Sequence, residues 1–189
     1  NGVQKVVDFA EVGPEDSICE IGPGLGAISF DLVQRAKRYV AIEIESSFAE
    51  NLKNELIDFP SADVLCSDVR DVNLEELIPD GERWAVVSNV PYSVSSEVIL
   101  WLLDQRKYLK SATLLFQREF AERVAAPPGG KVYGSLSVQC QLVADVKLGP
   151  RLGGTLFFPP ASVESRLIRL DFLEQPRWQI DDPELFRAV

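Results

Sequence analysis

The sequence predicts an α/β fold, in which a mostly parallel sheet of seven strands has helices on both faces and an antiparallel hairpin at one edge. Three observations support this fold class. Short β-branched or apolar runs alternate with amphipathic stretches of helical spacing. A glycine-rich turn follows the first apolar run directly. The last two runs are joined by a loop rich in glycine and proline, which favours an antiparallel pair.

The first half of the chain supplies four strands with helices between them. Short apolar runs predict strands at residues 17–21, 39–43, 62–66 and 84–88. One helix is expected from the glycine turn to about residue 37, and a second to about residue 57, with Ser46 or Ser47 as its cap. A third is expected to begin at Ser95 or Ser96, since apolar residues repeat there at helical spacing.

The second half supplies the remaining three strands. They are expected at residues 112–116, 145–148 and 166–172, with a loop at residues 149–160 between the last two. Helices are expected at residues 117–126, ended by a Pro-Pro-Gly-Gly run, and near residues 135–143. From residue 174 the chain becomes polar, and residues 183–189 look like the opening of another helix.

Composition narrows the classes of function. The chain has no histidine, which removes histidine-dependent nucleophiles and the commonest metal ligand, so no metal site is expected. Cys19, Cys66 and Cys140 lack metal-ligand spacing and are interpreted as small buried residues. A net charge of −10 argues against a basic nucleic-acid surface. No apolar run is long enough for a membrane span, so a cytoplasmic protein without a membrane partner is expected.

A cofactor cradle is predicted after the first strand. Gly22, Gly24 and Gly26 let the backbone turn tightly and approach a ligand, which favours a nucleotide-like cofactor. The spacing differs from the dinucleotide fingerprint Gly-x-Gly-x-x-Gly, so a pyrophosphate is not specifically indicated. A plain helix-packing turn stays open as the alternative for the glycines.

Acidic residues lie at the ends of the first two predicted strands and just past the third, where open α/β sheets bind ligands. Glu43 can accept hydrogen bonds from both ribose hydroxyls, and Asp68 from an adenine amine while Val69 supplies a backbone donor. Glu20 can accept from an ammonium group or orient the glycine loop. Glu43 or Asp68 alone also fits a solvated strand end or loop. The conjunction of these two acids with the glycine turn indicates a cofactor site, and Glu20 ranks below them.

The residues Asn89, Val90, Pro91 and Tyr92 follow the fourth strand and are predicted to hold an adenine. The Asn89 side-chain oxygen and the Val90 carbonyl can accept both hydrogens of an exocyclic amine, and Tyr92 offers a flat face to the ring. The amine lone pair then turns toward a methyl donor, and positioning replaces a general base. The alternative is a simple turn, with Tyr92 filling the core.

The chain resembles the small-subunit ribosomal RNA adenine dimethyltransferase family, whose core is similar to that of other Rossmann-like class I methyltransferases. The motifs carrying the resemblance lie at residues 20–26, 41–43, 67–69, 89–96, 117–124, 133–137 and 157–165. They follow the family's order and spacing over nearly the whole chain. The resemblance implies S-adenosyl-L-methionine as cofactor, held by Glu20, Gly22, Gly24, Glu43, Asp68, Val69 and Asn89.

For the substrate, the resemblance implies N6,N6-dimethylation of adenine in ribosomal RNA of an immature small ribosomal subunit, by a monomer. Phe157, or Phe158 if the register slips by one, would stack on the base opposite Tyr92. Arg118, Arg123 and Lys131 would contact phosphates. Arg118 and Arg123 equally suit pairing with Glu119 and Glu122 on a solvated helix.

The resemblance also implies a domain division and leaves rival functions open. Residues 1–173 are expected to form the methyltransferase domain, and residues 174–189 a linker and the start of a truncated helical C-terminal domain. The family's N-terminal Gly-Gln-x-Phe segment, which closes over the cofactor, does not precede Asn1. The rivals are a large-subunit enzyme of the antibiotic-resistance type, an enzyme acting on protein glutamine or DNA adenine, and a non-catalytic ribosome-assembly or transcription factor.

Overall fold

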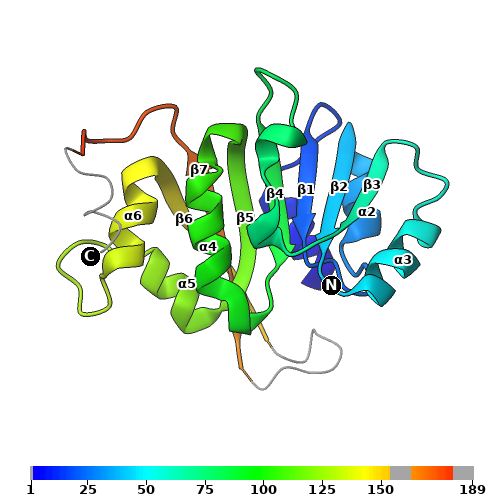
Figure 1. Ribbon diagram of the computed structural model, residues 1–189. Coiled ribbons are helices and arrows are strands. Elements are labelled where there is room, and N and C mark those ends of the chain that lie inside the picture. Colours follow the sequence, from blue (N-terminus) through cyan, green and yellow to red (C-terminus); the bar gives the residue numbers. More distant parts are fainter. Residues whose placement is uncertain (1, 154–162, 181–189) are drawn as a thin grey trace.

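Seven strands form one sheet in the structure, a computed structural model that describes residues 2–153 and 163–180 (Figure 1). They are β1 (Ser17–Ile21), β2 (Arg38–Glu43), β3 (Ala62–Cys66), β4 (Trp84–Asn89), β5 (Leu109–Gln117), β6 (Ala144–Leu152) and β7 (Ser165–Phe172). Their order across the sheet is β3-β2-β1-β4-β5-β7-β6. Pairs among β1 to β5 are parallel, whereas β7 runs antiparallel to both β5 and β6. The predicted fold class is confirmed.

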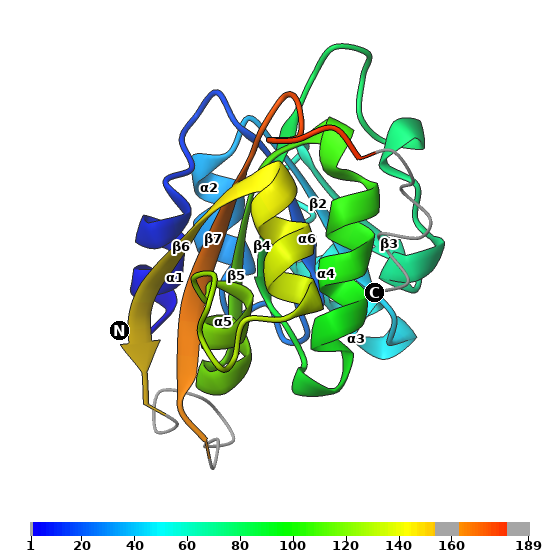
Figure 2. The same cartoon turned by 90° about the vertical axis from the view of Figure 1, so that its left-hand side faces the viewer.

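Helices cover both faces of the sheet, as Figures 1 and 2 show. The helices are α1 (Gly2–Ala10), α2 (Ser29–Arg35), α3 (Ser46–Glu55), α4 (Ser95–Asp104), α5 (Arg118–Val124) and α6 (Ser135–Val143). Apolar residues of α1, α2 and α3 share one buried cluster with the sheet, and those of α4, α5 and α6 share another. Strand residues alternate between the clusters, since successive side chains point to opposite faces. Ile18 therefore belongs to the first cluster and Cys19 to the second.

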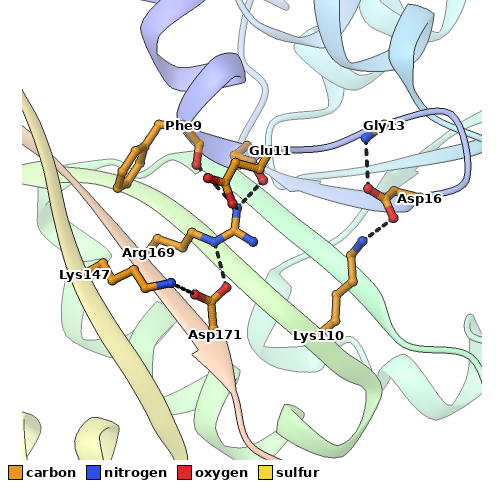
Figure 3. A network of polar contacts seen from close by, with 9 residues as sticks. Phe9, Glu11, Gly13, Asp16, Lys110, Lys147, Arg169 and Asp171 are labelled. Carbon is orange, nitrogen blue, oxygen red and sulfur yellow. Dashed lines mark hydrogen bonds and ion pairs between the residues drawn. The ribbon is translucent and has the colours of Figure 1, made fainter.

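The α1 helix was not among the predicted elements, although its apolar residues follow helical spacing. Its residues Val6, Val7 and Ala10 are at most 3% exposed. Arg169 on β7 fastens the end of this helix by donating to the carbonyls of Phe9 and Ala10, and it also pairs with Asp171 at 2.7 Å (Figure 3). The helix is thus packed on the antiparallel edge of the sheet.

Other predicted boundaries moved for identifiable reasons. The β6 strand continues to Leu152, through the part of the sequence expected to be a loop, and an irregularity between Leu148 and Arg151 accommodates the Gly-Pro pair. The α2 helix begins at Ser29, because the glycine turn occupies the preceding residues. The predicted serine caps were wrong: Glu45 and Val94 are the N-cap residues of α3 and α4, and neither caps with its side chain.

The chain beyond the sheet is fastened to α6 as far as it is described. Within the predicted linker 174–189, residues up to 180 are described, and the Arg177 N–H donates to the Leu142 carbonyl at 2.9 Å. The Arg177 guanidinium also pairs with Asp145. Among the described residues, no helix is both long and apolar enough to cross a bilayer.

Candidate functional site

The carboxyl ends of β1 to β4 meet at one edge of the sheet and bring the predicted site residues next to one another. Strand register places Glu43 opposite Cys66 and Ile21 opposite Ile42. The Ser88 hydroxyl, buried at the end of β4, donates to the Ile21 carbonyl at 2.6 Å. Residues at or just after the carboxyl ends of β1, β2, β3 and β4 are therefore neighbours at one end of the sheet.

The glycine loop is hydrogen-bonded to the carboxylate of Glu43. Gly22, Gly24 and Gly26 have φ angles of +63°, +54° and +74°, a region that glycine enters without steric cost. The Gly24 N–H donates to Glu43 Oε2 and the Glu45 N–H donates to Oε1, both at 2.9 Å. Glu43 is only 5% exposed, so it is part of the loop's structure as well as a candidate ligand.

Glu20 lies beneath the glycine loop and faces the protein interior. It is 1% exposed, and its Oε2 accepts a hydrogen bond of 2.5 Å from the hydroxyl of the fully buried Tyr39. Burial raises the pKa of the Glu20 carboxyl to about 7, against the lowering effect of the hydrogen bond from Tyr39, and the nearby Glu43 carboxylate raises it as well. The geometry favours orientation of the loop over direct contact with a ligand.

The carboxylate of Asp68 forms an ion pair with Arg70, two residues further along the chain. The guanidinium of Arg70 approaches both Asp68 carboxylate oxygens, with Nη2 2.5 Å from Oδ2, and the Arg70 N–H donates to Oδ1 at 2.9 Å. These hydrogen bonds from Arg70 lower the pKa of Asp68 to about 2. Asp68 also caps the short 3₁₀ turn that begins at Val69, so its carboxylate keeps one orientation at the end of β3.

The segment of residues 89–92, at the end of β4, adjoins the glycine loop. A Cβ placed on Gly22 would lie 3.7 Å from Pro91 Cδ, so the two segments are in contact range. Asn89 is exposed, and its side-chain amide makes no hydrogen bond with any described residue. Val90 is 1% exposed, so its carbonyl reaches a bound amine only after a local rearrangement of the turn. Tyr92 is 38% exposed and its hydroxyl lies 2.8 Å from the Ser165 hydroxyl.

The predicted phosphate contacts are spread over α5 and the following loop. Arg118 pairs with Glu164 at 2.7 Å, and the Arg123 guanidinium lies 5.1 Å from the ring centroid of Phe120. Neither forms the helix-internal pair that was the alternative, because Glu122 pairs with Arg166 and Arg151 instead. Lys131 is exposed and makes no ion pair with any described residue.

The described residues also line cavities away from this end of the sheet. A cavity of about 290 Å³ is lined by Gln117, Arg118, Glu119, Val163 and Glu164, beside the start of β7. A larger one of about 440 Å³ lies between α4, α6 and residues 175–180.

Some expectations were incomplete, wrong or outside the described residues. Phe157 and its alternative Phe158 fall in the range that the structure leaves out. Cys66 is exposed, which contradicts its interpretation as a buried residue, whereas Cys19 and Cys140 are buried. Within residues 2–153 and 163–180, no cluster of three acidic or cysteine side chains is arranged to hold a metal ion.

Sequence reasoning missed the partners of the site residues, namely Tyr39, Arg70 and Ser165. Tyr39 and Ser165 could be found only in the structure, because no local pattern links them to partners 19 and 73 residues away. Arg70 is two residues from Asp68, so its signal was present in the sequence as a basic residue beside the acid. Sequence reasoning also missed Leu25 and Ile44, which are 70% and 67% exposed beside the glycine loop and Glu43. Their signal was present in the sequence as apolar residues at positions where a solvated turn would carry polar ones.

The strand order, the glycine turn after β1 and the acid at the end of β2 define a class I methyltransferase. The chain belongs to the ribosomal RNA adenine dimethylase family, whose model matches residues 1–189. It is 34% identical over 192 residues to the ribosomal RNA small subunit methyltransferase A of Alkaliphilus oremlandii, covering 100% of this chain and 67% of the relative. The chain thus spans about two thirds of the length of such relatives.

Two solved structures support the fold. A dimethyladenosine transferase from Plasmodium falciparum matches with a TM-score of 0.80 and 28% identity, over 91% of this chain and 61% of that one. The 23S rRNA methyltransferase ErmE matches with a TM-score of 0.83 and 24% identity, over 99% of this chain and 73% of that one. At its level of identity, ErmE informs the fold alone.

Proposed function

We propose that the protein transfers methyl groups from S-adenosyl-L-methionine to N6 of adenine in small-subunit ribosomal RNA, giving N6,N6-dimethyladenine in two successive transfers. The proposal is supported by the proximity of Gly22 and Pro91, because a glycine loop suited to a cofactor then lies beside a turn suited to binding an amine. Membership of the adenine dimethylase family supports the same reaction.

In this proposal the cofactor lies along the carboxyl edge of β1 to β3. A carboxylate offers about four acceptor positions, and backbone amides use two of those on Glu43, so ribose hydroxyls can take the others. Asp68, held by Arg70, accepts from the adenine amine, and the Val69 N–H donates to the ring. Gly22 and Gly24 allow close approach, while Glu20 supports the loop from below or accepts from the ammonium group.

The transfer step needs orientation more than acid–base chemistry. The N6 lone pair attacks the methyl carbon, the bond from sulfur to that carbon breaks, and the amine proton passes to water. The amide of Asn89 is exposed and free to accept an amine hydrogen, and the Val90 carbonyl accepts the second once the turn adjusts. The exposed part of the Tyr92 ring offers the stacking face, with Phe157 as the opposing ring.

The names of the curated relatives favour the small subunit over the large one. We therefore propose an immature small subunit as substrate, a monomeric enzyme and a cytoplasmic setting. Residues 1–173 would form the catalytic domain, with residues 174–189 leading into a helical C-terminal domain. Lys131 is the best placed of the phosphate contacts, since Arg118 and Arg123 already have partners.

The test is to incubate the protein with radiolabelled S-adenosyl-L-methionine and immature small ribosomal subunits, and to identify the labelled nucleoside by mass spectrometry. Labelled N6,N6-dimethyladenosine is expected. Asn89→Ala should lower the transfer rate at least about 100-fold while the cofactor dissociation constant changes less than about twofold. The matched control is Asn51→Ala, at an exposed asparagine of α3, which should transfer normally. Cofactor binding without any transfer by the unmodified protein would favour the non-catalytic assembly factor instead.

A further inference from the structure

Tyr92 is connected to a residue that the sequence does not link to it. Its hydroxyl lies 2.8 Å from the hydroxyl of Ser165, which is 73 residues further along the chain. Ser165 is fully buried, whereas Tyr92 is 38% exposed. The bond therefore joins the buried start of β7 to the far end of a partly exposed ring.

The start of β7 is a firm anchor for such a bond. Ser165 pairs with Gln117 on β5 and with Leu152 on β6, so its backbone is held from both sides. The preceding residue, Glu164, accepts a backbone hydrogen bond from Arg118 at 2.9 Å and pairs with the Arg118 side chain. Because the strand around it is fixed, the Ser165 hydroxyl occupies a defined position.

The other end of the ring is fixed independently. Tyr92 starts a short 3₁₀ turn, and its carbonyl accepts a hydrogen bond from the Ser95 hydroxyl at 3.2 Å. A tyrosine side chain has two rotatable bonds before its ring, so anchoring both the backbone and the hydroxyl leaves little freedom for the ring plane. The hydroxyl is also occupied, which leaves the ring face as the part available to a ligand.

We propose that Ser165 is a positioning residue for methyl transfer, because its hydroxyl holds the Tyr92 ring at the angle at which the ring stacks on the target base. The inference rests on the function proposed above and assigns a second role to the start of β7. Ser165 itself touches neither cofactor nor base and acts through Tyr92.

The first test detects the hydrogen bond by NMR and does not depend on methyl transfer. The chain has four tyrosines, so a ¹³C NMR spectrum of protein labelled at the hydroxyl-bearing ring carbon should resolve their four signals. The signal that Tyr92→Phe removes is that of Tyr92. Ser165→Ala should shift the Tyr92 signal and leave the other three in place. Ser111→Ala is the matched control, because Ser111 is a buried serine of β5 near the opposite end of that strand.

The second test measures methyl transfer with saturating cofactor. Ser165→Ala and Tyr92→Phe should each lower kcat by about three- to tenfold, the loss expected for one hydrogen bond, with the KM for S-adenosyl-L-methionine unchanged. The double variant should lose no more than either single one, since both remove the same bond. Ser111→Ala should keep the unmodified kcat, which separates positioning from a general effect on folding.

The outcomes distinguish this inference from the function on which it rests. An unchanged Tyr92 signal in Ser165→Ala overturns the inference whatever the activity. A shifted signal with unchanged kcat, or additive losses in the double variant, overturns it as well. If the unmodified protein transfers no methyl group although the signal responds to Ser165→Ala, the proposed function fails while the anchoring of the ring stands.

Discussion

Glu20→Gln should change how stability depends on pH. The carboxyl is 1% exposed and has a folded-state pKa of about 7 against an ordinary value of 4.5. Between about pH 4.5 and pH 7 the folded protein therefore binds a proton that the unfolded chain has released, so stability falls as the pH rises through this window. Below it the carboxyl is protonated in both states, and above it the full cost of burying the charge is present.

The size of the effect follows from the same two values. Their difference corresponds to roughly 3 kcal/mol between pH 4 and pH 8, an order-of-magnitude figure for a buried group. Glutamine keeps an acceptor for the Tyr39 hydroxyl and cannot ionise, so the variant should lack this loss.

The assay is urea unfolding of both proteins at several pH values between 4 and 8. The free energy of unfolding of the unmodified protein, minus that of Glu20→Gln, should fall by about 3 kcal/mol across the range. Tyr39→Phe removes the hydrogen bond that lowers the Glu20 pKa, so it should move the transition to higher pH. Parallel pH profiles for the unmodified protein and Glu20→Gln would refute the reasoning.

Three further predictions concern packing and the cofactor edge. Arg169→Met should lower the free energy of unfolding by about 2–3 kcal/mol and speed hydrogen exchange in α1, because it removes the donor to the Phe9 and Ala10 carbonyls. Arg151→Met changes an exposed arginine and should cost far less, so equal losses in the two variants would contradict this prediction. Gly149→Ala should cost about 1–3 kcal/mol in thermal unfolding, since a Cβ there would lie 2.7 Å from the Phe9 ring, whereas Gly13→Ala meets no atom within 4 Å and should be nearly neutral. Arg70→Ala should raise the pKa of Asp68 from about 2 toward 3.8, measured by ¹³C NMR titration, and should weaken cofactor binding several-fold. An unchanged Asp68 pKa in this variant would argue against the Arg70 contacts.

The order of elements could be predicted because each apolar run is bounded by a clear local signal. The glycine turn after residue 21 and the Pro-Pro-Gly-Gly run after residue 126 both separate elements where the sequence indicated. The Gly149-Pro150 pair instead led to a wrong prediction of a loop, since glycine and proline usually interrupt strands. Pairing with β7 overrides that local preference, and the irregularity in the ladder absorbs it.

The site could be predicted only as far as chain order determines proximity. In a parallel sheet the residues after consecutive strands share one edge, which is why Glu43, Asp68 and Asn89 could be grouped in advance. The contacts of Tyr92 with Ser165 and of Arg118 with Glu164 cross from the parallel part of the sheet to its antiparallel edge. Such pairs depend on register and side-chain reach, and no sequence spacing encodes either.

In the proposed function, the two amide hydrogen bonds to Glu43 link cofactor recognition to the shape of the glycine loop. Neutral glutamine has a single side-chain oxygen, and its amino group cannot accept from an N–H, so Glu43→Gln would leave the Gly24 or Glu45 amide without its partner. A substitution of Glu43 made to alter cofactor binding would therefore also remodel the turn beside it. A protein engineer seeking altered cofactor selectivity would have to redesign residues 22–26 together with position 43.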